Sequence, residues 1–248
     1  MTLIQAIFLG ILQGITEFLP ISSSGHLVLL ERLFNLQPSL TFNVFLHGAS
    51  LMAIIIFFKK DFLRLFQDIA TLFKIILGTI PIIIVGFLLK DRIESAFSSL
   101  EFVGFAFLIT SGILFFTVFC KKNEKSLEEL GLFGAFFIGL FQALAILPGI
   151  SRSGTTISSA LYQGAKKYTA FKFSFLLGSV AILGALVVEA PKLSAFVLTP
   201  SVILGFVFAL IFSLLALKLL KKAVLHSKFY YFSFYCFVLG LLCLILAV

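Results

Sequence analysis

The stretch Gly10-Ile-Leu-Gln-Gly-Ile-Thr-Glu-Phe-Leu-Pro-Ile-Ser-Ser-Ser-Gly-His26 places a compact group of polar and ionisable residues between long apolar runs. A related stretch, Gly139-Leu-Phe-Gln-Ala-Leu-Ala-Ile-Leu-Pro-Gly-Ile-Ser-Arg-Ser-Gly-Thr155, follows about 130 residues later. Both read Gly-x-x-Gln, an apolar segment, a proline and then a turn rich in Ser and Gly. Ionisable residues at membrane depth are costly. We therefore interpret the paired stretches as a functional site.

The composition is that of a polytopic membrane protein. Of the 248 residues, 60% are hydrophobic and 12% are charged, and the mean hydropathy is +1.17. A soluble domain carries about 25% charged residues. Apolar runs long enough, or nearly so, to cross about 30 Å of hydrocarbon lie at approximately 41–58, 75–90, 102–120, 173–190, 201–219 and 229–248. Pro81 falls within the second run, where a helix bundle tolerates a kink.

The two polar stretches belong to segments 3–30 and 132–165, whose apolar arms are too short and too interrupted for ordinary spans. Each segment predicts a helix, a turn and a second helix, the pattern of a re-entrant hairpin that lines a polar cavity. A second repeat supports the duplication, because Phe45-Leu-His-Gly-Ala-Ser50 and Phe175-Leu-Leu-Gly-Ser179 follow the two hairpins at nearly the same offset.

We therefore expect an all-α polytopic membrane protein with a single integral membrane domain, residues 1–248. Its repeat halves are about 1–122 and 130–248, and each is a re-entrant helix-turn-helix hairpin plus three transmembrane helices. Because three spans are an odd number, the second half enters from the opposite side, which makes an inverted-topology repeat. The first residues lack the basic start and cleavage site of a signal peptide, so we expect 1–12 to be part of the fold.

The basic residues predict an orientation. Most of the nineteen Lys and Arg residues fall in loops on one side of this arrangement, and the other side holds Arg32, Lys90, Arg92 and Lys192. The positive-inside rule places the basic side in the cytoplasm, with both termini outward. The net charge of +8 is explained by these loops, so no nucleic-acid partner is expected. The three cysteines lie in or beside apolar runs without metal-ligand spacing and are expected to be packing residues.

The hairpin tips predict a phosphate site. Helix N-termini bind anions through backbone N–H groups and partial positive charge, and Arg152 adds a forked cation suited to phosphate oxygens. The candidate phosphate-binding residues are Ser22, Ser24, Gly25, Ser151, Arg152, Ser153, Gly154 and Thr155.

Further residues in the same stretches would make the phosphate site catalytic. His26 is a candidate nucleophile or general acid or base, and Ser23 is an alternative nucleophile. Glu17 lies one helical turn after Gln13 and is a candidate ligand for Mg²⁺ or Ca²⁺. It could equally orient His26 or pair with Arg152. We expect His47, alone in an apolar run, to be a packing residue.

At these residues the sequence resembles the bacitracin-resistance family of undecaprenyl-diphosphate phosphatases. The family motif Glu/Gln-x-x-x-Glu, followed by Phe-Leu-Pro-x-Ser-Ser-x-Gly-His, matches Gln13 through His26. A second motif, Pro-Gly-x-Ser-Arg-Ser-Gly-x-Thr, matches Pro148 through Thr156. The resemblance implies an enzyme of the bacterial cytoplasmic (inner) membrane that hydrolyses undecaprenyl diphosphate, recycles the carrier lipid for peptidoglycan synthesis and confers bacitracin resistance. It also implies a divalent cation and an active site facing the periplasm.

Carried over by position, the resemblance makes Glu17 the acidic site residue, Arg152 the phosphate clamp, and Ser23 and His26 the candidate nucleophiles. Gln13 stands where the family often has Glu, which puts a cation bridged by two carboxylates in doubt and leaves Gln13 a weak ligand. Because imidazole can attack phosphorus directly, we favour His26, and His26→Ala should abolish phosphate release. The alternative function is a transporter or lipid flippase, since inverted repeats with broken helices are common in carriers. The oligomeric state is not visible in the sequence.

Overall fold

The computed structural model describes residues 2–34, 40–65, 67–120, 124–189 and 199–247. Within them the chain is helical, and the only extended pairing is an isolated bridge between Lys125 and Ala165. The helices are α1 (Leu3–Thr16), α2 (Ser23–Phe34), α3 (Leu40–Phe57), α4 (Lys59–Leu65), α5 (Ile69–Leu88), α6 (Lys90–Phe97), α7 (Leu100–Phe116), η1 (Thr117–Phe119), α8 (Leu127–Leu144), α9 (Arg152–Tyr162), α10 (Lys167–Glu189), α11 (Pro200–Leu225), η3 (Phe229–Tyr231) and α12 (Phe232–Ala247). This confirms an all-α polytopic membrane protein.

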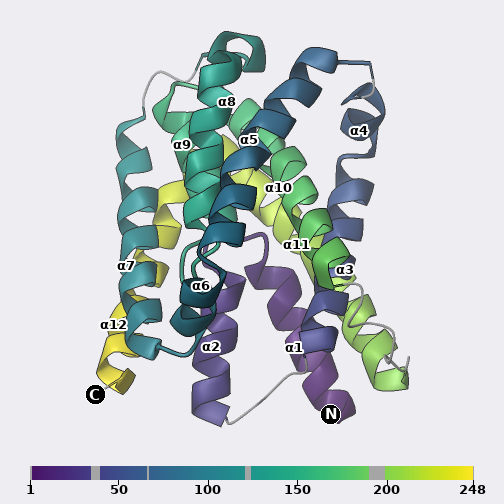
Figure 1. Cartoon of the computed structure of the whole chain (residues 1–248), viewed down its shortest axis with the longest axis vertical. Coiled ribbons are helices and arrows are strands. Elements are labelled where there is room, and N and C mark those ends of the chain that lie inside the picture. The colour runs from purple at the N-terminus through teal and green to yellow at the C-terminus, as the bar shows by residue number, and fades with distance from the viewer. Residues whose placement is uncertain (1, 35–39, 66, 121–123, 190–198, 248) are drawn as a thin grey trace.

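Two helical hairpins enter the bundle from opposite ends (Figure 1). Helices α1 and α2 come from the end at which the chain begins and ends, and α8 and α9 come from the other end. Their tips meet between the two ends, where the backbone N–H of Gly149 donates a hydrogen bond of 3.2 Å to Ser22 Oγ. Opposite entry of two similar hairpins is the arrangement that the inverted repeat predicts.

The predicted spans correspond to α3, α5, α7, α10, α11 and α12, with differences in detail. Helix α3 is followed by α4 across a bend of 80°, and α5 continues through Pro81 as one helix. The short helix α6 was not predicted. Large apolar side chains, such as Phe87 (85% exposed) and Phe133 (81% exposed), cover the outer surface. Such a surface fits a lipid environment.

The prediction that both hairpins have arms too short for a span is wrong for α8. This helix has 18 residues and a mean hydropathy of 1.5, and it is long and apolar enough to cross a membrane. It begins at Leu127 because Ser126 and Glu129 form a capping box, which adds a turn before the apolar run. Gly131, with φ of 64°, bends the chain between that turn and the rest of α8.

Each hairpin packs against the opposite half of the chain through glycines. A methyl group on Gly10 of α1 would lie 2.2 Å from the carbonyl oxygen of Gly205 in α11. A methyl group on Gly139 of α8 would lie 2.3 Å from the carbonyl oxygen of Gly78 in α5. Small residues at such crossings let helices approach closely in a membrane, where association depends on packing and not on burial from water. Residues 121–123, at the predicted boundary between the halves, lie outside the described residues.

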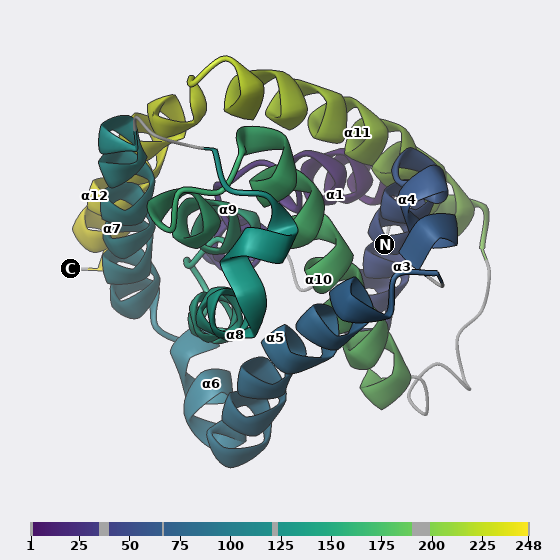
Figure 2. The same cartoon turned by 90° about the horizontal axis from the view of Figure 1, so that it is seen from above.

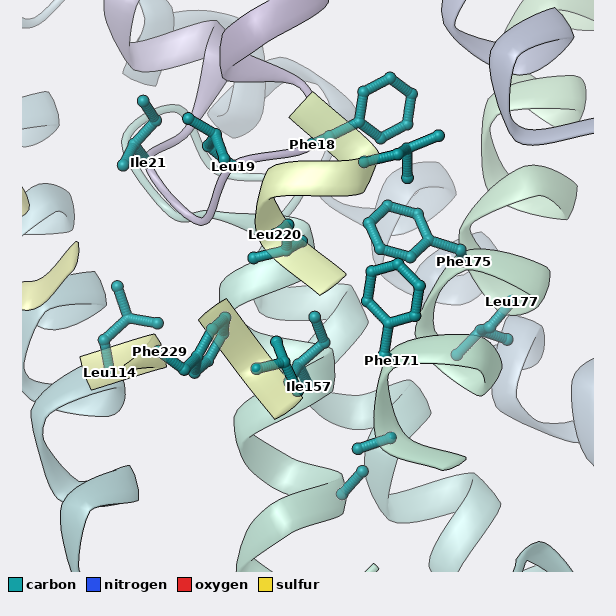
Figure 3. Close-up of a cluster of buried hydrophobic side chains, with 14 of the residues drawn as sticks. Phe18, Leu19, Ile21, Leu114, Ile157, Phe171, Phe175, Leu177, Leu220 and Phe229 are labelled. Atoms are coloured by element: carbon teal, nitrogen blue, oxygen red, sulfur yellow. The ribbon is translucent and has the colours of Figure 1, made fainter. Parts of the chain in front are cut away.

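The tips are enclosed by the surrounding helices. Viewed from above, α9 lies inside a ring to which α5, α7, α11 and α12 contribute (Figure 2). Phe18, which follows Glu17 directly, is fully buried, and its ring centroid lies 5.6 Å from that of Phe175 in α10. Figure 3 shows Phe18 in the same cluster as Phe171 and Phe175. This packing fixes the first tip, and with it Glu17, against α10.

Candidate active site

The two hairpin tips share one capping hydrogen bond, although their backbones differ, since Ser22 has a left-handed φ and Ser151 an extended conformation. Ser22 Oγ accepts the backbone N–H of Gly25 at 3.3 Å, and Ser151 Oγ accepts the backbone N–H of Gly154 at 3.1 Å. Each serine caps the second helix of its hairpin, because a hydroxyl satisfies an N–H that has no partner within the helix. Ser22 adopts a left-handed φ of 62°. The residues that follow the two caps, Ser23 and Arg152, therefore occupy equivalent positions in the two halves.

Glu17 receives hydrogen bonds from both tips. Ser23 Oγ donates to Oε2 at 2.8 Å, and Arg152 Nη2 donates to Oε1 at 2.7 Å. The side chains of Glu17 and Arg152 are 7% and 13% exposed, so this ion pair is buried. A buried charge requires a well-placed partner, because removing it from water costs several kcal/mol. The two halves thus hold the two oxygens of one carboxylate.

Two further side chains complete this group. Gln13 Nε2 donates to Glu17 Oε2 at 3.1 Å and lies 3.2 Å from His47 Nδ1. His47 Nδ1 is 3.7 Å from Glu17 Oε2, and the His47 side chain is 36% exposed in the cavity. The expectation that His47 is a packing residue is therefore wrong. The sequence contains one sign of this role. The equivalent position in the second half of the repeat is the apolar residue Leu177, so a histidine at position 47 departs from the repeat.

These residues line a cavity of about 320 Å³ between the hairpin tips and α3, α5, α6 and α10. Its polar lining consists of Thr16, Glu17, Ser22, Ser23, Ser24, His47, Ser151 and Arg152. Its apolar lining consists of Ile82, Phe97, Ala145, Ile146, Ile150, Ala181, Ile182 and Ala185. A cavity lined by both ionic and apolar side chains suits a molecule with an ionic head and a hydrocarbon chain.

His26 does not line this cavity. Its Nδ1 lies 2.7 Å from the carbonyl oxygen of Ser22, and its Nε2 lies 2.8 Å from Tyr235 Oη. Because a carbonyl oxygen only accepts, the neutral ring carries its proton on Nδ1, and Nε2 accepts from the tyrosine hydroxyl. The ring also stacks on Tyr235, with centroids 5.7 Å apart, and meets Phe107 edge-on. The structure therefore separates His26 from Glu17, while it brings Ser23 to Glu17.

The predicted phosphate-binding residues fall into two groups. Ser22, Ser24, Ser151 and Arg152 line the cavity. Gly25, Ser153, Gly154 and Thr155 lie behind it and shape the tips, since the N–H groups of both glycines are engaged by the caps. Thr155 likewise donates its N–H to the carbonyl oxygen of Ser151 at 2.9 Å.

Comparison with known proteins identifies the family. Residues 6–242 match the family described as "Bacitracin resistance protein BacA". The chain belongs to the BacA family. Over 244 residues it is 41% identical to the undecaprenyl-diphosphatase of Thermosipho africanus, which covers 95% of this chain and 97% of that protein. It is 40% identical to the undecaprenyl-diphosphatase of Methanococcus vannielii over 245 residues, covering 96% and 97%. For the undecaprenyl-diphosphatase of Thermosipho melanesiensis the identity is 42% over 248 residues, covering 97% and 98%.

The divalent cation implied by the resemblance to the BacA family fits the site only in part. Among the described residues, no three His, Cys, Asp or Glu side chains gather as a metal-binding group. Glu17 is the one carboxylate in the cavity lining, and Gln13 presents its amide N–H, not its oxygen, to Glu17. A cage built from protein ligands alone does not fit. A cation such as Mg²⁺, held by one carboxylate, water and substrate phosphates, does fit.

Proposed function

We propose that this member of the BacA family hydrolyses undecaprenyl diphosphate to undecaprenyl phosphate and inorganic phosphate. The reaction recycles the carrier lipid for peptidoglycan synthesis, and removal of the diphosphate form confers bacitracin resistance. One structural observation carries the proposal: Ser23 and Arg152 reach the two oxygens of Glu17 inside a cavity that is lined by both polar and apolar side chains. The names of the similar proteins, which cover nearly the whole chain, support the choice of substrate.

The cavity receives the two ends of the substrate on different sides. Arg152 and the hydroxyls of Ser22, Ser24 and Ser151 face the diphosphate. A guanidinium is suited to this role because it offers several donors in a plane and keeps its charge. The side chains of Ile82, Ile146 and Ile182 line the apolar side, where the first isoprene units lie.

We assign the attack on phosphorus to Ser23, since its hydroxyl already donates to Glu17 at 2.8 Å. Glu17 accepts the Ser23 proton as Oγ bonds to the terminal phosphorus. The bond from that phosphorus to the bridging oxygen breaks, and undecaprenyl phosphate leaves with the electron pair. Glu17 gives the proton that it took from Ser23 to the departing undecaprenyl phosphate. Water then attacks phosphoserine and gives a proton to Glu17, which passes it to Ser23 Oγ as inorganic phosphate leaves. Arg152 stabilises the negative charge on the phosphoryl oxygens in both steps.

His26 remains the alternative nucleophile proposed from the sequence. Its attack would require Nε2 to leave Tyr235 and the ring to turn toward the cavity. In the structure, His26 links the carbonyl oxygen of Ser22, at the start of α2, to the hydroxyl of Tyr235 in α12. Both roles make His26→Ala harmful, so loss of activity in that variant does not separate them.

A divalent cation, Mg²⁺ or Ca²⁺, would be held by Glu17 together with the diphosphate and would neutralise part of the phosphate charge. Because Glu17 is the one carboxylate in the cavity lining, we propose that such a cation enters together with the substrate.

We further propose that the site faces the periplasmic side of the bacterial cytoplasmic membrane, with both termini outward. The excess of Lys and Arg at the opposite end of the bundle supports this orientation. The hairpin α1–α2, which carries Glu17 and Ser23, enters from the end that holds the termini (Figure 1).

The test is phosphate release from undecaprenyl diphosphate by purified protein in detergent, with and without EDTA. We expect release by the wild type, loss of release in Ser23→Ala, strongly reduced but measurable release in Arg152→Ala, and loss on chelation. With the wild type, a rapid denaturing quench at neutral pH after addition of substrate labelled in the terminal phosphate should recover label on Ser23. Label on His26 would transfer the nucleophilic role to that residue. No release by folded wild-type protein would favour the carrier alternative, which a liposome flux assay measures.

A further inference from the structure

We propose that Gly178 of α10 is a positioning residue for Arg152. The missing side chain at this position leaves the space in which the guanidinium lies while it contacts Glu17. The inference rests on the proposed function, because it concerns how the phosphate-binding arginine is held. It does not depend on which residue attacks phosphorus.

Among the described glycines, Gly178 is the one at which an added methyl group would lie nearest to another side chain. A methyl group built on Gly178 would lie 1.5 Å from Arg152 Nη1 and 2.8 Å from Cζ. Nη1 therefore occupies the place that a side chain at position 178 would take. Any residue larger than glycine requires the guanidinium to move.

The Nη1 end of the Arg152 guanidinium is held by packing and not by a hydrogen bond. Nη2 donates to Glu17 Oε1 at 2.7 Å, whereas Nη1 is buried and has no hydrogen-bond partner among the described residues. The planar group has two ends, and a single hydrogen bond leaves its tilt undetermined. The flat surface of the α10 backbone at Gly178 sets that tilt.

The backbone of Arg152 is anchored to the same helix one turn earlier. Thr156 Oγ1 donates to the carbonyl oxygen of Arg152 at 2.7 Å and lies 2.6 Å from Ser174 Oγ. Ser174 precedes Gly178 by four residues, which is about one turn of α10. The start of α9 is therefore held over Gly178, and the side chain of Arg152 runs along α10 to reach Glu17.

A methyl group at position 178 should displace the side chain of Arg152 and leave helix α10 in place. Its nearest neighbours are the terminal atoms of a long, flexible side chain. By contrast, a methyl group on Gly10 or Gly139 would meet the backbone of another helix at 2.2 or 2.3 Å, so the helices themselves would separate. Gly178→Ala is therefore expected to fold normally and to lose the alignment of Arg152.

The experiment compares Gly178→Ala with two matched controls. Gly184 lies on the same helix with no atom within 4 Å of an added methyl group. Gly48 is the counterpart of Gly178 in the repeat, and an added methyl group would meet only Phe206, at 3.9 Å. We expect Gly178→Ala to lower kcat/KM at least about tenfold, the size of a misplaced charged hydrogen bond. Gly184→Ala and Gly48→Ala should match the wild type, and all three variants should keep the wild-type helical circular dichroism spectrum.

A double-mutant cycle separates positioning from general damage. If Gly178 acts through Arg152, Gly178→Ala in the Arg152→Ala background should change kcat/KM by less than about twofold, because coupled residues are not additive. An undiminished effect in that background would overturn the proposal, as would a Gly178→Ala enzyme with wild-type kinetics.

A second readout does not require turnover. Phenylglyoxal labelling followed by mass spectrometry reports the reactivity of Arg152, whose side chain is 13% exposed. We expect labelling of Arg152 to be several-fold faster in Gly178→Ala than in Gly184→Ala. Equal labelling rates would overturn the positioning role even in an active enzyme. A faster rate in a folded protein that releases no phosphate would support the positioning role and reject the proposed function.

Discussion

The two hairpin tips are alike in their capping hydrogen bond and different in chemistry. Ser22 and Ser151 cap their helices through the same hydrogen bond, to the N–H three residues later. On the first arms, however, Glu17 corresponds to Ile146, and both line the cavity. After the caps, Ser23 corresponds to Arg152. The duplication thus supplies a symmetric frame, and the reacting groups are distributed unequally over it.

The asymmetry has an electrostatic reason. The tips meet around one small cavity, so a second carboxylate at position 146 would share it with Glu17, and like charges at close range raise the cost of ionising both. With isoleucine at 146, the single carboxylate can receive a hydroxyl from one half and a guanidinium from the other. In the proposed mechanism, one half of the repeat supplies the base and the other supplies the cation.

The largest effect should come from removing the carboxylate. Glu17→Gln keeps the size and polarity of the side chain but cannot accept a proton from Ser23, so kcat/KM should fall by about 10²–10⁴-fold. Ile146→Val, at the equivalent position, should stay within about twofold of the wild type, since it removes one methylene from the apolar side. Steady-state phosphate release measures both. Near-normal turnover by Glu17→Gln would contradict the division of roles between the halves.

The second comparison concerns the two caps. Ser22 Oγ accepts N–H groups from Gly25 and, across the interface, from Gly149, whereas Ser151 Oγ accepts one from Gly154. Ser151→Ala should therefore cost about 1 kcal/mol of stability, and Ser22→Ala about 2 kcal/mol, because a second buried N–H loses its partner. Thermal unfolding in detergent, followed by circular dichroism, gives the two values. Equal losses would mean that the hydrogen bond between the tips contributes nothing.

The third comparison concerns Gln13 and Gln142, whose replacement by leucine should affect activity in one case and stability in the other. Gln13 donates to Glu17, while neither polar atom of the buried Gln142 side chain has a partner among the described residues. An unsatisfied buried amide costs about 1–3 kcal/mol, so Gln142→Leu should raise the melting temperature and leave turnover unchanged. Gln13→Leu should lower kcat/KM by about tenfold, since Glu17 loses a donor. If Gln142→Leu destabilises the protein, its amide has a partner that the described residues do not include.

The smallest effect is expected at the contact between His26 and Tyr235. Tyr235→Phe removes one hydrogen bond of 2.8 Å and keeps the stacked ring. A single such bond contributes about 1 kcal/mol, and activity should remain within about threefold of the wild type. A gain in activity would indicate that Nε2 works better without its tyrosine partner, as the nucleophilic role of His26 requires.

Much of the architecture was predictable because the repeat and the apolar runs are local patterns. The sequence places Glu17, Ser23 and Arg152 on two similar turns, and the inverted repeat brings those turns together. Helix α8 was misjudged because its start depends on the capping box at Ser126, which lies before the apolar run.

The orientations of the two histidines were not predictable, because distant residues decide them. His26 turns to Tyr235, which lies 209 positions along the chain. His47 reaches Gln13 and Glu17 because α3 packs beside α1. The role proposed for Gly178 likewise follows only from the path of the Arg152 side chain, which no spacing in the sequence records.

The close approach of Gly10 to Gly205 has a consequence for biosynthesis. Helix α1 leaves the ribosome first, yet the surface that Gly10 packs against, at Gly205 of α11, is made almost last. Until then the first hairpin lacks its main packing partner, although α3 and α7, which contact α1 and α2, are already made. Assembly of the catalytic centre is therefore delayed until translation is nearly complete, and a prematurely terminated chain would carry Glu17 and Ser23 without the helix that seats them.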